Sequence, residues 1–109
     1  MTENYDIAIV GGGPAGCSVG VFCSWAGLDT VVVSNGRSTL QKCAFVEDYL
    51  GFPAGVEPQS LLELVKLHAR EAGCTMTEES VASAAVAESG FVLTLDQESI
   101  TTDRLLAAS

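Results

Sequence analysis

Apolar and polar positions alternate in blocks along the first third of the chain. Residues 7–10 form a short apolar run that ends in a glycine cluster, and residues 30–33 form a second run rich in valine. Between the two runs, apolar and small side chains recur at helical spacing as far as Ala26, and Gly27 stands where a helix C-terminal cap belongs. Short β-branched runs beside glycine are typical of buried strands. The pattern therefore predicts a strand–helix–strand unit whose two strands are parallel.

The remainder of the chain predicts one further helix and four further strands. Pro58 marks the start of the helix, an apolar stripe continues to Ala72, and Gly73 ends it. A turn at Ser89-Gly90 separates two of the strand-like runs. The expected fold class is α/β: a Rossmann-like half-domain with a parallel sheet, helices and a small β-meander. The four strand-like runs are residues 74–77, 81–87, 91–95 and 104–107.

The junction between the first strand and the first helix carries the clearest chemical signal. Gly11, Gly13 and Gly16 fit the spacing G-x-G-x-x-G. Pro14 suits the first turn of a helix because it lacks an N–H that would be unpaired there. In this arrangement Gly11 allows the tight turn, Gly13 the close approach of a pyrophosphate, and Gly16 the packing of helix against strand. Because the start of a helix also favours an anion, the motif predicts a dinucleotide-binding site.

Length, charge and cysteine usage restrict the class of protein. The chain has 109 residues, enough for one domain with one core, and 48% of them are hydrophobic. A formal net charge of −9 argues against nucleic acid and anionic membranes as partners. The sequence has neither a secretory leader nor an apolar stretch long enough to span a membrane, so a cytoplasmic location is expected.

The four cysteines and the single histidine, His68, do not predict a metal site. The cysteines form no C-x-x-C pair and no metal-ligand spacing with His68. They are expected to be small, mostly buried apolar groups in a reducing compartment rather than a disulfide framework. Their positions are 17, 23, 43 and 74.

Three segments give the chain a resemblance to a known family. Gly11–Gly16, Val46–Pro53 and Leu105–Ser109 together resemble the thioredoxin-reductase-like flavoproteins. The second segment carries most of the resemblance, because many unrelated flavin and nicotinamide enzymes share the first. The resemblance extends over nearly the whole chain, but it covers only the first half of the FAD domain of that family. It implies FAD as the cofactor and a single FAD/NAD(P)-binding Rossmann-like domain over residues 1–109.

The resemblance also implies which residues contact the cofactor. Asp48 occupies the position at which the family usually has an Asn near the flavin and the ribityl chain. Val81 occupies the position of a backbone pair that meets the adenine, and the loop from Arg37 to Leu40 passes beside the cofactor. The pyrophosphate of FAD would be held by Gly11, Gly13, Pro14, Ala15 and Gly16.

The end of the second strand departs from the family pattern. Ser34, followed by Asn35, stands where the family has a Glu or Asp that accepts both hydroxyls of the adenosine ribose. A serine hydroxyl cannot match a carboxylate there, since charged hydrogen bonds contribute roughly 1.5–3 kcal/mol. Lost acidity with a cation nearby, Arg37, suits a 2′-phosphate, so NADP is the alternative cofactor. The terminal Ala-Thr-Gly of the family is replaced by Ala107–Ser109.

The sequence thus predicts the FAD-binding segment of a thioredoxin-reductase-like oxidoreductase, without the NADPH domain or the redox C-x-x-C. Such a segment should not be fully active alone, and a second copy or another protein completing the flavin site is the expected partner. Two alternatives stay open: a stand-alone adenine-nucleotide or NADP module without catalysis, and a degenerate scaffold that assembles with a partner. No residue can be named as catalytic, and Glu78-Glu79 is interpreted as a solvated edge.

Overall fold

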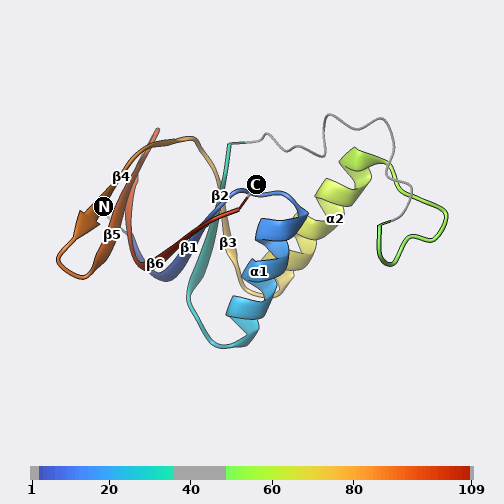
Figure 1. Cartoon of the computed structure of the whole chain (residues 1–109), viewed down its shortest axis with the longest axis horizontal. Helices are drawn as coiled ribbons and strands as arrows, with labels where there is room; N and C mark the ends of the chain where they lie inside the picture. The colour runs from blue at the N-terminus through green and yellow to red at the C-terminus, as the bar shows by residue number, and fades with distance from the viewer. Residues whose placement is uncertain (1–2, 36–48, 109) are drawn as a thin grey trace.

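The computed structural model describes residues 3–35 and 49–108, which form six strands and two helices (Figure 1). Each strand and helix that the pattern predicts is present, and the expected α/β class with its meander is confirmed. In chain order the elements are β1 (Glu3–Val10), α1 (Pro14–Trp25), β2 (Thr30–Ser34), α2 (Pro58–Glu71), β3 (Thr75–Glu78), β4 (Val81–Ala87), β5 (Gly90–Leu95) and β6 (Ser99–Ala107).

All six strands belong to one sheet with the order β3-β2-β1-β6-β5-β4. The first four strands in this order run parallel to one another, and β5 and β4 continue the sheet in antiparallel fashion. The strand–helix–strand unit β1-α1-β2 is therefore parallel, as expected. Because four strands point the same way, their carboxyl ends meet at one edge of the sheet, which is where the candidate site lies.

Each face of the parallel strands carries its own hydrophobic core. Ile9 and Val32 point toward α1 and α2 and pack with buried side chains of the two helices. Ala8 and Val31, one residue earlier on the same strands, pack on the opposite face with side chains from β5 and β6. Figure 1 shows the two helices on one side of the parallel strands and the β4–β5 hairpin on the other.

The helices are short and lie close to the sheet. α1 has 12 residues and α2 has 14, and within the described part of the chain no helix is long and apolar enough to cross a membrane. Gly20 of α1 faces β2 and the start of β3: a Cβ there would lie 3.0 Å from Val32 Cγ2 and 3.1 Å from Cys74 Sγ. The absence of a side chain at Gly20 therefore sets how closely α1 approaches the sheet.

Two strands are longer than their apolar runs predict. β1 begins at Glu3 and β6 at Ser99, because the two pair in parallel from Glu3–Ile100 through Val10–Ala107. The polar side chains in the added part of β6 find partners: Thr101 Oγ1 donates to Asn4 Oδ1 (2.8 Å), and Thr102 Oγ1 donates to the Arg104 carbonyl (2.7 Å). Pairing with a neighbouring strand therefore overrides the weak local pattern.

The hairpin between β4 and β5 turns one residue earlier than predicted. Gly90 already pairs with Ala87, so Glu88 and Ser89 form the turn. Gly90 has φ of +102°, and a Cβ on it would overlap the Thr102 carbonyl. A glycine is thus required there by both conformation and space.

A valine at Gly20 should separate α1 from the sheet. Gly20→Val adds three carbons where the nearest atoms already lie at contact distance, so we expect the free energy of unfolding to fall by about 1–3 kcal/mol. Urea denaturation followed by circular dichroism measures the change. Ser18→Val is the matched control, because Ser18 is an exposed residue of the same helix. Equal unfolding midpoints for the two variants would contradict the close packing at Gly20.

Candidate nucleotide-binding site

A cavity of about 380 Å³ lies at the carboxyl edge of the parallel strands. The residue that follows each of the four strands lines it: Gly11 after β1, Asn35 after β2, Glu79 after β3 and Ala108 after β6. Ligands of open α/β sheets bind in this position, outside the carboxyl ends of the strands. The remaining lining residues are Val10, Val33, Ser80 and Val81.

The turn after β1 is closed on both sides by backbone contacts. The Gly11 N–H donates to the Val33 carbonyl (2.8 Å), and the Ala108 N–H donates to the Val10 carbonyl (2.7 Å). Gly11 has φ of +125°, and a Cβ on it would overlap the carbonyl of Ala108. The tight turn expected of Gly11 is therefore present, and it brings the chain after β6 against the chain after β1.

The start of α1 is open to an anion. Gly13 is the N-cap residue with φ of −79°, Pro14 follows in the first turn, and no side chain caps the helix. The first turn carries no acidic residue that would oppose a negative ligand. A Cβ on Gly16 would overlap the Gly11 carbonyl, so Gly16 packs the helix against the turn. Backbone N–H groups and the helix dipole together make such a terminus attractive to a phosphate.

The structure brings only part of the predicted site residues into the cavity. Gly11, Asn35 and Val81 line it. Ser34 lies one residue deeper: it is 4% exposed, and its side chain packs against Gly12, which has no room for a Cβ. Gly13, Pro14, Ala15 and Gly16 form the adjoining turn and the first turn of α1, where Ala15 is exposed. Arg37, Leu40 and Asp48 lie outside the described residues.

Glu79 and Ser80 are site residues that the pattern did not identify. The interpretation as a solvated edge holds for Glu78, which is exposed and pairs with Lys66 (Nζ–Oε1 3.5 Å), but it is wrong for Glu79, which is half-buried and lines the cavity. The Glu79 carboxylate accepts the Gln97 N–H (2.6 Å). The one available signal was position, since Glu79 follows a strand whose carboxyl end reaches the site.

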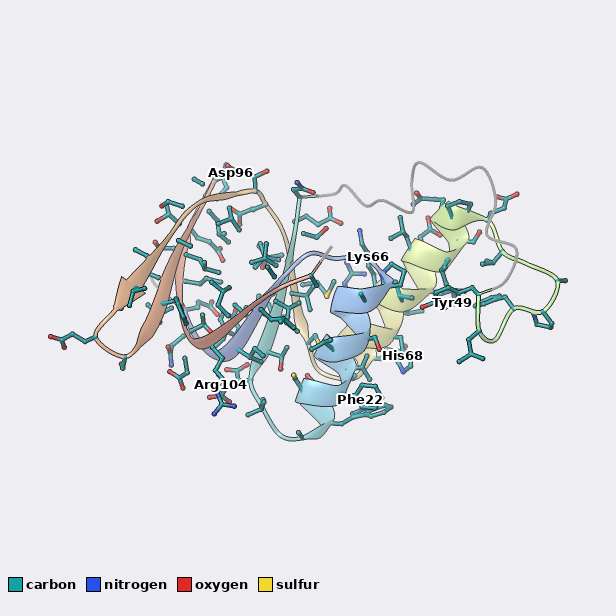
Figure 2. The ribbon with its side chains drawn as sticks, viewed as in Figure 1. Phe22, Tyr49, Lys66, His68, Asp96 and Arg104 are labelled. Atoms are coloured by element: carbon teal, nitrogen blue, oxygen red, sulfur yellow. The ribbon has the colours of Figure 1, made fainter. Side chains whose placement is uncertain are left out.

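A second cavity, of about 400 Å³, forms a groove between α1 and α2 on the helical side of the molecule. Phe22 is 65% exposed and Trp25 is 63% exposed along it, and the Trp25 and His68 rings lie 6.1 Å apart. Figure 2 shows Phe22 on α1, His68 on α2, and Tyr49 in the segment that precedes α2. The groove therefore carries two large exposed aromatic side chains, which distinguishes it from the rest of the helical surface.

The described cysteines behave as packing groups. Cys17 and Cys74 are buried and Cys23 is half-buried, and all three carry free thiols. Burial raises the pKa of the Cys17 thiol, whose Sγ donates to the Gly12 carbonyl (3.5 Å). A protonated thiol is a poor nucleophile, so Cys17 supports the glycine turn rather than acting chemically. Cys43 lies outside the described residues.

Comparisons with known proteins agree with this geometry. A family model described as an FAD binding domain matches residues 6–47. A thioredoxin reductase of Chlamydia trachomatis is 28% identical over 94% of this chain. The chain spans about a third of the length of that relative, 35%. The family model and the relative both point to FAD, a dinucleotide, as the cofactor.

Solved structures share the fold at the same partial coverage. A thioredoxin reductase from Gloeobacter violaceus superimposes with a TM-score of 0.91 and 26% identity, over 98% of this chain and 34% of that one. A thioredoxin reductase from Giardia duodenalis gives a TM-score of 0.90 and 27% identity, over 99% of this chain and 36% of that one. Together with the sequence matches, they support the thioredoxin-reductase-like FAD oxidoreductases as the family of this chain.

Proposed function

We propose that the chain is one domain, residues 1–109, which binds the adenosine diphosphate end of FAD for an oxidoreductase. The observation that carries the proposal is the convergence of Gly11, Asn35, Glu79 and Ala108 on one cavity beside the open start of α1. β1 lies where the chain changes direction across the sheet, with β2 on one side and β6 on the other. Dinucleotides bind at such switch points.

The glycine turn would hold the pyrophosphate. Gly11 and Gly16 keep the turn tight by their lack of side chains, and Gly13 is the N-cap residue of α1. Pro14 and Ala15 occupy the first positions of α1, where backbone N–H groups point out of the helix. An anion is favoured there by the dipole as well as by the hydrogen bonds.

The adenosine would occupy the cavity beside β2 and β3. Val81, at the start of β4, would offer its backbone groups to the adenine edge, and Asn35 would lie beside the ribose, since both residues line the cavity. Ser34 would not contact the adenosine directly, but its side chain would pack against Gly12 and so support the glycine turn. Contacts from Arg37, Leu40 and Asp48 to the cofactor belong to the proposal through the resemblance alone.

FAD, when bound, supplies the hydride and electron chemistry, while the protein binds, orients and insulates it. The described residues would supply binding and orientation, and none of them is assigned a catalytic role. The chain would therefore contribute the cofactor site to an FAD-dependent oxidoreductase rather than act as a complete enzyme.

The purified chain should bind ADP nearly as well as FAD. The cavity suits the adenosine end, so the isoalloxazine should add little: we expect dissociation constants within about threefold of each other by calorimetry, and loss of FAD on gel filtration. NADP should bind more weakly than both. NADP binding tighter than FAD and ADP would favour the stand-alone NADP module, which the absence of a carboxylate at position 34 also supports. Binding of none of the three nucleotides would favour the scaffold that assembles with a partner.

A branched side chain in the glycine turn should abolish nucleotide binding. Gly13 has φ of −79°, which any residue adopts, so the backbone itself tolerates Gly13→Val. The branched side chain would fill the space in which a pyrophosphate approaches the backbone, and we expect at least tenfold weaker ADP binding. Ser18→Val, on the same helix but outside the turn, should bind normally. Unchanged ADP affinity in Gly13→Val, with a native circular dichroism spectrum, would contradict the phosphate role.

The groove between α1 and α2 is the surface through which we propose that the chain meets a second copy or another protein. The exposed rings of Phe22 and Trp25 support a protein partner. A cytoplasmic location is part of the proposal, supported by the free thiols of the three described cysteines.

Trp25 reports on this surface because it is the single tryptophan of the chain. If two copies meet through the groove, its emission should shift to the blue as the protein concentration rises, in step with doubling of the mass in sedimentation. Trp25→Phe should retain the association, whereas Leu64→Asp, at a half-exposed groove position, should abolish it. A monomer at all concentrations would leave another protein as the partner.

A further inference from the structure

We propose that Glu79 takes the ribose hydroxyls of the bound adenosine, in place of a carboxylate at the end of β2, and thereby selects against a 2′-phosphate. The inference rests on the proposed function and names a determinant of specificity within that site. Glu79 is the only charged residue among the described residues that line the cavity.

Strand register places Glu79 beside the usual ribose position. Ser34 pairs with Glu78 across the parallel β2–β3 ladder, so the next residues along each strand, Asn35 and Glu79, are neighbours at the same edge. Adjacent strands lie about 4.8 Å apart. A Glu side chain reaches across one such spacing, and a carboxylate after β3 can therefore serve a ribose seated at the tip of β2.

Ser34 cannot serve this role from where it lies. Its side chain is buried against Gly12 and is not part of the cavity lining. The hydroxyls of a ribose in the cavity would instead face Asn35 and Glu79, and only the carboxylate accepts bonds from both hydroxyls.

Two hydrogen bonds hold the Glu79 segment in place before any ligand binds. Gln97 N–H donates to Glu79 Oε1 (2.6 Å), and Ser80 N–H donates to Asp96 Oδ2 (3.2 Å). The connection between β3 and β4 is therefore hydrogen-bonded to the connection between β5 and β6. Figure 2 shows Asp96 at this edge of the sheet. Glu79 Oε2 has no hydrogen-bond partner within the described part of the chain, which leaves an acceptor for the ligand. A 2′-phosphate would meet the Glu79 carboxylate in the cavity and would be repelled.

Titration of the full chain with four nucleotide probes tests the assignment. Glu79→Gln keeps the shape and an acceptor for Gln97 but removes the charge, and Glu98→Gln removes the same charge from an exposed residue outside the cavity. We expect Glu79→Gln to weaken ADP about fivefold by calorimetry, to weaken 2′-deoxy-ADP by less because only the bond from the 3′-hydroxyl is affected, and to improve 2′,5′-ADP relative to ADP. Glu98→Gln should match the wild type with all of these probes.

A comparison of two nucleotides on the wild-type chain tests the assignment without any change to the fold. It should bind 2′-deoxy-ADP several-fold more weakly than ADP, because the 2′-hydroxyl is lost. An ADP affinity and a 2′-phosphate discrimination that are the same in Glu79→Gln as in the wild type would overturn the assignment. An equal loss for ADP and 2′-deoxy-ADP but not for inosine diphosphate would move Glu79 to the adenine amino group and also overturn it. Wild-type chain that binds neither ADP nor FAD would refute the proposed function itself, and the assignment with it.

Discussion

The site depends on close backbone contacts at three glycines, where a side chain would not fit. At Gly11 a Cβ would overlap the Ala108 carbonyl, at Gly12 it would strike the Ser34 side chain, and at Gly16 it would overlap the Gly11 carbonyl. Three backbone segments from distant parts of the sequence thus meet at distances that only glycine allows. The cavity, the open helix start and the placement of the residues after β2, β3 and β6 all depend on this contact.

The two cores keep the edge of the sheet in position. Side chains of β1 and β2 alternate between the helices on one face and the β5–β6 side chains on the other, so a shift of either strand by one residue would exchange its side chains between the two cores and disrupt the packing of both. Register is fixed in consequence, and with it the order in which Asn35 and Glu79 arrive at the cavity. On the proposed assignment of Glu79, specificity at the ribose would depend on strand pairing as much as on residue type.

Sequence periodicity was sufficient for the parts of the fold that rest on local patterns. The glycine turn, α1, the buried valines of β2 and the stripe of α2 could all be predicted, because apolar spacing and glycine are local signals. The first half of β6 could not, since Thr101 and Thr102 join the sheet through pairing with β1. Glu79 was missed for a similar reason: its chemistry depends on a neighbour in space, Asn35, which is 44 positions away in the sequence.

The pairing of β1 with β6 has a consequence for how the protein is made. Glu3 lies beside Ile100 and Val10 beside Ala107, so β1 cannot pair with β6 until about 100 further residues have been synthesised. Closing so long a loop is entropically costly, and folds dominated by distant contacts form slowly. During synthesis the glycine turn therefore emerges early but lacks the Ala108 wall against which it closes. A nucleotide that binds only the closed turn would therefore stabilise only the chains in which β6 has already paired with β1.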